Sequence, residues 1–325
     1  MAQNDIGIDL GTTTIIIAQE GQGVVLNQPS VVAVDTRKNS VLEVGDKALA
    51  MVGRTPNYIS AIFPLKDGVI SDHTMTRELI CRFVNQVYSS HMVKPRVAVC
   101  VPAAITGIES DAVVEAVVAA GARQVYLIDE PIAAALGSGI DITVPDGRMI
   151  IDIGGGSSEV AVGRGGDLCW SHSYPMGAVR FTRGEVMSHQ AVAHLENRCY
   201  QEWLPMQVQP DLLIGVGGTL TTLAAMDLQL AVYDAEKVEG HRVSYDALCG
   251  HIERLQAMTP EERRHVPGLQ PKRSDIIVAG LLIAKSFLQR YHIPAITVSE
   301  RDLMEGVFFR HSFHDAAWNS RDRQS

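Results

Sequence analysis

Apolar and polar positions along the chain form two kinds of segment. Short runs rich in Val and Ile, bounded by Gly, Pro, Asn or Asp, are typical of buried strands. They predict strands at residues 6–9, 14–18, 31–35, 97–101, 125–128, 149–153, 160–163, 212–216 and 295–298. Longer stretches with apolar residues three or four apart predict helices at residues 76–90, 108–120, 131–137, 218–226, 245–256 and 275–291. Strands that alternate with helices indicate the α/β class.

One pattern occurs twice, about half a chain apart. The stretch IGIDLGTT from residue 6 and the stretch IIDIGGGSS from residue 150 share one order: an apolar strand, Asp, x-Gly, hydroxyl residues. In both places an apolar strand follows. We therefore predict a duplicated lobe, with a first lobe at residues 1–145 and a second at residues 146–312. Residues 141–148, DITVPDGR, have the turn chemistry of a connector, and residues 313–325 form a polar tail.

Charge and composition narrow the class of protein. The net charge is −9 over 325 residues and no block of Lys and Arg occurs, which argues against a nucleic-acid partner. No apolar stretch reaches the roughly 18 residues that span a bilayer, and residues 1–11 lack the pattern of a signal peptide. The five cysteines have no metal-binding spacing. We expect a cytoplasmic protein with reduced thiols.

The two Asp-x-Gly turns have the chemistry of a phosphate site. Glycine lets backbone N–H groups approach phosphate oxygens, and nearby hydroxyls add donors. The residues concerned are Gly11, Thr12, Thr13 and Thr14 in the first turn and Gly154, Gly155, Gly156 and Ser157 in the second. Asp9 and Asp152, at the strand ends, are candidates to hold Mg²⁺ through its waters. The alternative is two ordinary β-hairpins with glycine turns. The occurrence of two such similar turns favours a site in which they bind a polyphosphate from both sides.

A third glycine turn follows the strand at residues 212–216. Gly217, Gly218 and Thr219 stand at the start of a predicted helix, and a helix N-terminus attracts anions. The turn is not a Walker A loop, because no Gly-Lys-Ser/Thr follows it. The alternative is that its glycines serve tight packing.

Glu130 is the candidate catalytic carboxylate. The strand at residues 125–128 delivers it to the start of a helix, where Pro131 suits the first turn. A carboxylate there could cap the helix, or it could orient and deprotonate an attacking water, with Ser157 polarising the same water. Two basic residues, Lys66 and Arg273, could neutralise phosphate charge or simply face solvent.

The first half of the chain resembles MreB, the bacterial actin homologue. The matching stretches include IGIDLGTTT, FPLKDGVISD, KPRVAVCVPAAIT, AGARQVYLIDEPIAAALGSG and MIIDIGGGSSEVAV, which span residues 5–162 in order. A subdomain of the MreB first lobe corresponds to about residues 28–72. The MreB loop that touches the membrane corresponds to the stretch with Met92 and Val93. This resemblance implies self-assembly into filaments and adds weak membrane association to the expectations.

The second half, over residues 163–309, resembles the Ppx/GppA phosphatases, which include exopolyphosphatases and guanosine pentaphosphate hydrolases. The matching stretches include SYPMGAVRFT, PDLLIGVGGTLTTLAAMD, VEGHRVS, PKRSDIIVAG and ITVSERDLMEGV. Both families belong to the superfamily of actin, sugar kinases and heat-shock chaperones. The joint resemblance implies a two-lobed actin-like ATPase fold of duplicated ribonuclease H-like domains with a cleft between the lobes. It also implies Mg²⁺ at Asp9 and Asp152, and a water activated by Glu130.

The two resemblances imply different substrates. Between residues 183 and 210 the chain has too few residues for the MreB subdomain that carries the base-clamping helix. Three functions therefore compete. The first is an MreB-like ATPase of the cytoskeleton, the second a hydrolase of polyphosphate or guanosine pentaphosphate, and the third a nucleotide switch that forms no filament. All three predict Mg²⁺ and a phosphoanhydride substrate, ATP in the first.

Overall fold

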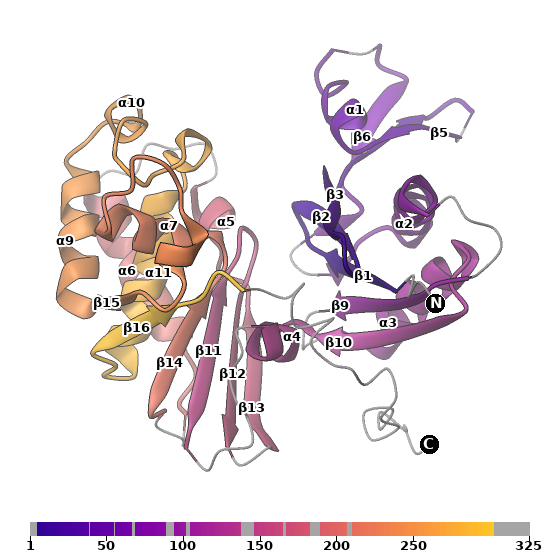
Figure 1. The fold of residues 1–325 in the computed structure, drawn as a ribbon. Helices are drawn as coiled ribbons and strands as arrows, with labels where there is room; N and C mark the ends of the chain where they lie inside the picture. The colour runs from indigo at the N-terminus through magenta and orange to yellow at the C-terminus, as the bar shows by residue number, and fades with distance from the viewer. Residues whose placement is uncertain are drawn as a thin grey trace.

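Two β-sheets organise the molecule (Figure 1). The computed structural model describes residues 5–38, 40–54, 56–66, 69–88, 94–101, 105–137, 146–164, 167–182, 189–206 and 210–301. The first sheet is built from residues up to 129 and the second from residue 148 onward. The predicted lobe boundary at residue 145 and the polar tail at residues 313–325 lie outside the described residues.

The first sheet has five strands in the order β10-β9-β1-β2-β3. Its strands are β1 (Ile6–Leu10), β2 (Thr14–Gln19), β3 (Gly23–Pro29), β9 (Arg96–Val101) and β10 (Gln124–Asp129). β1, β9 and β10 run parallel to one another, whereas β2 is antiparallel to β1 and β3 is antiparallel to β2. The C-terminal ends of β1 and β10, which carry Asp9 and Asp129, therefore lie at the same end of the sheet.

The second sheet repeats this plan. Its strands are β11 (Arg148–Ile153), β12 (Ser158–Arg164), β13 (Asp167–Tyr174), β14 (Leu212–Val216), β15 (Arg242–Ser244) and β16 (Ala295–Val298), in the order β13-β12-β11-β14-β16-β15. β11 pairs antiparallel with β12 and parallel with β14, as β1 does with β2 and β9. The same order and directions support the duplication that the two Asp-x-Gly motifs predicted.

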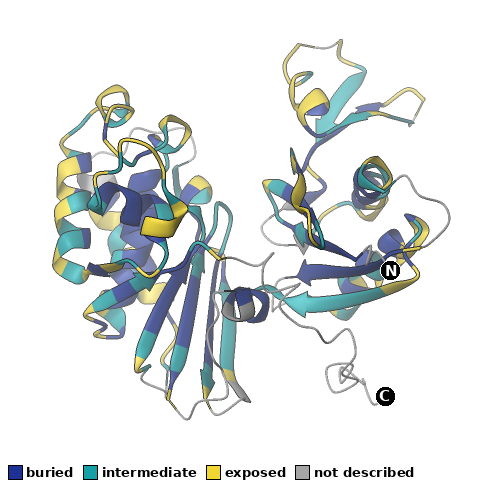
Figure 2. Cartoon of the chain, in the orientation of Figure 1, coloured by how far each residue is buried: buried dark blue, intermediate teal, exposed yellow. Residues whose placement is uncertain are grey.

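Helices cover the sheets. They are α1 (Asp46–Leu49), α2 (His73–Val87), α3 (Gly107–Ala119), α4 (Glu130–Gly137), α5 (Ala178–Thr182), α6 (His189–Glu202), α7 (Gly218–Asp227), α8 (Ala235–Val238), α9 (Tyr245–Gln256), α10 (Pro260–Arg263) and α11 (Ile277–Arg290), with a 3₁₀ turn, η1, at Pro271–Arg273. α11 is buried along most of its length and packs against α6 and α9. In Figure 2 the buried residues concentrate in the sheets and the inner helices.

α4 lies between the two sheets (Figure 1). Its Ala133 and Ala134 belong to one buried cluster with Ala98 and Cys100 of the first sheet and with residues of the second sheet, namely Ile150, Ala161, Ile214 and Val216. Small side chains at this contact let the helix approach both sheets. The packing fixes the start of α4, which is where Glu130 stands.

A small sheet forms an outgrowth of the first lobe. It has the order β5-β4-β6, with β4 (Val32–Asp35), β5 (Ser40–Val44) and β6 (Ile59–Ile62), and a hairpin of β7 (Leu65–Lys66) and β8 (Val69–Ile70) follows it. Its core with α1 is small, comprising Val31, Ala33 and Ala48. This outgrowth falls within residues 28–72, where the sequence indicated an extra subdomain.

The nine strands and six helices predicted from periodicity all occur, with ends shifted by a few residues. β3, β13 and the short strands were missed because polar residues interrupt their apolar pattern. α6 was missed as well, because its residues are on average polar. Among the described residues, no helix has both the length and the apolar character needed to cross a bilayer.

Candidate functional site

The first candidate turn joins β1 to β2. Asp9 is in β1, paired in register with Ile16 of β2 and Cys100 of β9, and the turn follows at once. Ser30, directly after β3, supports the turn, because its Oγ donates to the Gly11 carbonyl at 2.7 Å and its N–H donates to the Thr13 carbonyl at 3.0 Å. The carbonyls of this turn are thus engaged on the side of β3.

The second candidate turn joins β11 to β12 and is held by α5. The N–H groups of Ala178 and Val179 donate to the carbonyls of Gly154 and Gly155, at 3.0 and 2.9 Å. Arg180 Nε donates to the Gly156 carbonyl at 2.7 Å. Within the described residues, no group accepts from the N–H groups of Gly155, Gly156 or Ser157. Those donors are available to an anion, which is how glycine-rich turns bind phosphate.

The two turns face one another. A Cβ built on Gly156 would lie 3.6 Å from Thr12 Cβ, and one built on Gly155 would lie 3.4 Å from Thr13 Oγ1. The structure therefore brings together the hydroxyl residues of the first turn and the glycines of the second, although about half the chain separates them. The two motifs that we predicted to face one another are therefore in contact in this fold.

The third turn reaches the same place from β14. Gly217 has φ of 86°, a conformation that favours glycine, and a Cβ there would lie 2.2 Å from Asp152 Oδ1. The carboxylate of Asp152 thus stands directly at the N-terminus of α7. Because Gly217 offers no side chain, the first N–H groups of α7 keep their capacity for an anion.

Arg273 also lies at this helix start. Its guanidinium atoms would be 2.0 to 2.3 Å from a Cβ at Gly218, so they rest against the backbone of the first helical residue. Arg273 Nε is buried and has no hydrogen-bond partner among the described residues. Burial lowers the pKa of the guanidinium from its usual value, yet the group stays charged at neutral pH. Of the two interpretations for Arg273, a phosphate partner fits this position better than a solvent-exposed side chain.

Thr219 contributes less than its sequence position suggested. Its side chain is 3% exposed, and a Cβ on Gly280 of α11 would lie 2.8 Å from its Oγ1. The hydroxyl therefore packs between α7 and α11, and only the backbone N–H of Thr219 is placed to face a ligand. The side chain of Lys66, in β7, lies outside the described residues, as do Met92 and Val93.

Carboxylates crowd the space between the turns. Glu130 begins α4, and burial raises its pKa well above the usual value, with further contributions from Glu159, Asp9, Asp152 and Asp129. Burial and then Glu159 raise the pKa of Asp152 to about 7. Burial likewise raises the pKa of Glu159 to about 7, against hydrogen bonds that lower it. Crowded carboxylates with raised pKa values are typical of functional sites.

Glu159 was not among the sequence-derived candidates. It is 3% exposed in β12, opposite Asp152 of β11 in the strand register. Its Oε1 accepts a hydrogen bond from Ser173 Oγ at 2.9 Å, and the Ser157 hydroxyl also bonds to the carboxylate. The signal that could have found it is a Glu three residues after the glycine triplet, directly before the apolar run Val-Ala-Val.

The carboxylates fit Mg²⁺. No group of three or more His, Cys, Asp or Glu side chains among the described residues has the geometry of a protein metal cage. Mg²⁺ does not need one, since it is usually held by one or two carboxylates together with water and substrate phosphates. Asp9 and Asp152 supply oxygen ligands of the right kind, and a cation would relieve the repulsion that raises the pKa values.

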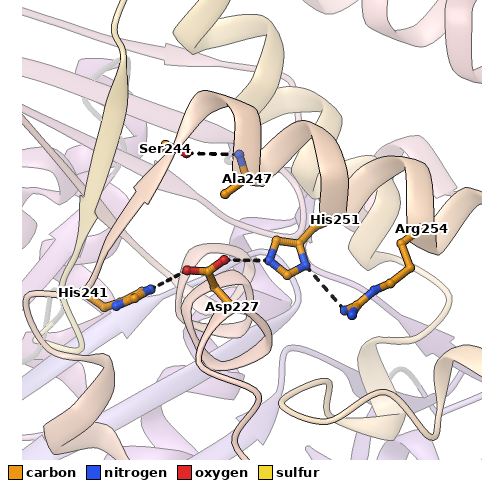
Figure 3. A network of polar contacts seen from close by, with 6 residues as sticks. All are labelled: Asp227, His241, Ser244, Ala247, His251 and Arg254. Carbon is orange, nitrogen blue, oxygen red and sulfur yellow. Dashed lines mark hydrogen bonds and ion pairs between the residues drawn. The ribbon is translucent and has the colours of Figure 1, made fainter.

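A separate polar network lies at the far end of α7 (Figure 3). The Asp227 carboxylate contacts His241 Nε2 at 2.7 Å and His251 Nε2 at 2.9 Å. The two hydrogen bonds lower the pKa of Asp227, against desolvation. Arg254 lies 3.5 Å from His251 Nδ1. The network ties the C-terminal end of α7 to α9 and to the turn before β15, so it steadies the helix whose other end carries Gly217.

Two duplicated sheets with facing glycine turns and a helix between them define the actin-like ATPase fold. The description of the MreB/Mbl protein family matches residues 3–238, well beyond residue 162, where we expected that resemblance to end. The chain belongs to the MreB/Mbl family.

One relative is the cell shape-determining protein Mbl of Bacillus cereus, 40% identical over 231 residues, which cover 71% of this chain and 67% of that protein. Other curated relatives align with this chain over only about half of their own length. The Ppx/GppA phosphatase of Aquifex aeolicus superposes with a TM-score of 0.62 at 20% identity, covering 95% of this chain and 99% of that one. MreB5 of Spiroplasma citri bound to ADP superposes with a TM-score of 0.58 at 21% identity, covering 99% of each. Both superpositions describe the fold.

Proposed function

We propose that this protein is an MreB-like ATPase that binds ATP with Mg²⁺ between the facing turns and hydrolyses the terminal phosphoanhydride. The observation that carries the proposal is the set of carboxylates Asp9, Glu130, Asp152 and Glu159 gathered beside the two turns. Family membership and the ADP-bound relative with this fold support a nucleotide as the ligand.

The first and second turns would hold the phosphates. The free N–H groups of Gly155, Gly156 and Ser157 would donate to phosphate oxygens, with Thr12 and Thr13 opposite. Asp9 and Asp152 would hold Mg²⁺, which neutralises phosphate charge when bound. Gly217 leaves room for Asp152 at the start of α7, so the third turn completes the same site.

Glu130 would act on the attacking water. Burial and the neighbouring carboxylates raise its pKa well above the usual value, which makes it a stronger base once it is ionised. Water would attack the terminal phosphorus as the bond to the bridging oxygen breaks, and Glu130 would take the proton. Ser157 is hydrogen-bonded to Glu159, so its hydroxyl is oriented to assist.

A second candidate function rests on Arg273. The guanidinium at the start of α7 would suit a further phosphate, as in polyphosphate or guanosine pentaphosphate, which Ppx/GppA-type hydrolases cleave. We place the ATPase first because family membership covers residues 3–238, whereas the Ppx/GppA likeness, at 20% identity, describes only the fold.

We also propose a cytoplasmic protein that assembles with further copies of itself. The cell shape-determining relatives support assembly. Weak membrane contact at Met92 and Val93 remains part of the proposal, on the resemblance alone.

One assay separates the candidate functions. The protein is incubated with Mg²⁺ and ATP, polyphosphate or guanosine pentaphosphate, while phosphate release and light scattering are followed together. ATP hydrolysis with a rise in scattering supports the filament-forming ATPase. Phosphate release from polyphosphate or guanosine pentaphosphate without scattering supports the phosphatase. Binding of ATP without turnover or scattering supports a nucleotide switch, and no binding at all would refute the proposal.

A further inference from the structure

The outer edge of the first sheet is open. β3 is the last strand of the order β10-β9-β1-β2-β3, and among the described strands it pairs only with β2. No described backbone group bonds to the outer side of residues 23–27. The edge closes at Gln28, whose Oε1 accepts from the Asp46 N–H at 2.9 Å, and at Pro29, whose carbonyl accepts from the Val31 N–H at 2.9 Å.

This edge lacks the usual protection. Edge strands are commonly guarded by Lys, Glu or other charges, because unpaired backbone groups recruit further strands. From residue 21 to residue 34 this chain has no charged side chain. Val24 and Val25 are 57% and 37% exposed on the strand. Val25 is an extra residue in the pairing with β2, and this bulge interrupts the regular spacing of the edge.

A hollow of about 380 Å³ runs beside the edge. One wall is β3 together with the end of β2 and the turn that joins them, and the other wall is the C-terminal end of α2, which contacts β3 directly. Five of its eight lining residues carry carboxamides, namely Gln19, Gln22, Asn27, Gln28 and Gln86, and none is charged. Apart from Gln28, these amides form no hydrogen bond within the part of the chain that the structure describes.

We propose that the edge of β3 binds an extended, uncharged segment of a partner protein by strand addition. The backbone of residues 23–27 would supply ladder hydrogen bonds, which is how exposed edges recognise peptides. Carboxamides donate and accept, so they complement the amide groups of a neutral peptide, and Val24 and Val25 would be covered. The site is independent of the phosphate turns.

The hollow favours a single strand over a second copy of this chain. Its volume is at the small end for a ligand site, enough for a few residues of one extended segment. A second copy that offered its own β3 would bring its α2 as well, and the space beside β3 is already bounded by α2.

The test is selection from a phage-displayed library of random decapeptides on the full-length protein. Enriched peptides are synthesised, and their affinities are measured for wild type, Val25→Lys and Gln86→Lys. We expect about tenfold weaker binding to either variant, because an ammonium group would lie against a neutral, desolvated strand. Hydrogen exchange of residues 24–27 should slow when peptide binds. Val232→Lys is the matched control, since Val232 is 81% exposed in the second lobe.

Each other result overturns the proposal. Failure of any peptide to enrich, equal affinity for the β3 and α2 variants, or slowed exchange elsewhere would each exclude strand addition at β3. A concentration-dependent dimer that Val25→Lys abolishes would show that the occupant is a second copy. Thermal unfolding of all variants checks that they fold. If Val25→Lys fails that check, Gln86→Lys decides, because it changes the opposite wall.

Discussion

Asp152 and Glu159 stand opposite one another across β11 and β12, as partners in the strand register. Burial raises the pKa of each carboxyl group to about 7, and the charge of Glu159 adds to the rise at Asp152. A buried pair of this kind is costly unless a proton or a cation is shared. The pair therefore makes the stability of the second lobe depend on pH, and the Mg²⁺ that we propose at Asp152 would change this dependence.

Stability should fall as pH rises when Mg²⁺ is absent. The folded-state pKa values of Asp152 and Glu159 lie above their unfolded values, so the folded protein binds more protons between pH 4 and 7. The stabilising contribution of these protons is complete below the unfolded pKa and is lost as pH rises through about 7. We expect Tm to drop by on the order of 5 °C from pH 5 to pH 8, measured by calorimetry with a chelator. Mg²⁺ should reduce the drop, and Glu159→Gln should flatten it; a Tm that rises across this range contradicts the assignment.

Glu130→Ala should separate binding from turnover. Removing a general base typically slows a reaction by about 10²–10⁴-fold, whereas the turns that we propose to bind phosphate are unchanged. We expect retained affinity for a fluorescent ATP analogue and phosphate release reduced by about that factor. Glu109→Ala is a suitable control, because Glu109 belongs to the capping box of α3, away from the turns. Unchanged phosphate release in Glu130→Ala would show that another group activates the water.

Arg273→Ala should weaken the binding of phosphate-rich ligands. Its guanidinium lies at the start of α7, and its buried Nε has no partner in the part of the chain that the structure describes. A charge-assisted hydrogen bond contributes about 1.5–3 kcal/mol. Titration calorimetry with ATP and with polyphosphate should show an affinity loss of about tenfold or more for at least one ligand. Lys272→Ala is the matched control, since Lys272 is exposed on the same 3₁₀ turn. Equal effects of the two substitutions would mean that Arg273 serves packing alone.

Asp227→Ala should destabilise the second lobe without touching the phosphate turns. The carboxylate holds two histidines, at 2.7 and 2.9 Å, and losing it leaves both without this partner. We expect the free energy of unfolding to fall by about 1–3 kcal/mol at neutral pH, measured in urea. Asp234→Ala removes a partly exposed carboxylate that pairs with the exposed Lys237, and it should change the free energy of unfolding little. The double variant tests whether the network acts as a unit. If it does, His251→Ala alone should lower the free energy of unfolding as much as Asp227→Ala, and adding His251→Ala to Asp227→Ala should lower it no further.

Much of the site could be found from local sequence. Asp9 and Asp152 each follow a short apolar run and precede a glycine, and the fold puts both at strand ends beside the turns. Glu130 precedes a proline that suits a first helical turn, and α4 begins at Glu130 itself. These residues can be predicted because the ends of strands and the starts of helices have characteristic local sequences.

Glu159 could not be found in this way. A polar residue inside a strand normally faces solvent, and only the register with β11 and the packing of α4 bury its side chain opposite Asp152. Thr219 shows the converse. Its position after two glycines suggested a hydroxyl for phosphate, but the close approach of α11 at Gly280 turns that hydroxyl into the helix interface.

The sequence by itself determined the α/β class, the duplication and the strand ends that carry Asp9 and Asp152, because hydrophobic periodicity and glycine turns are local properties. Tertiary structure decided which turns face each other, that Arg273 lies at the start of α7, and that Glu159 joins the carboxylates. It also left the edge of β3 open beside α2. These relations depend on long-range packing between segments far apart in the chain, which no local pattern specifies.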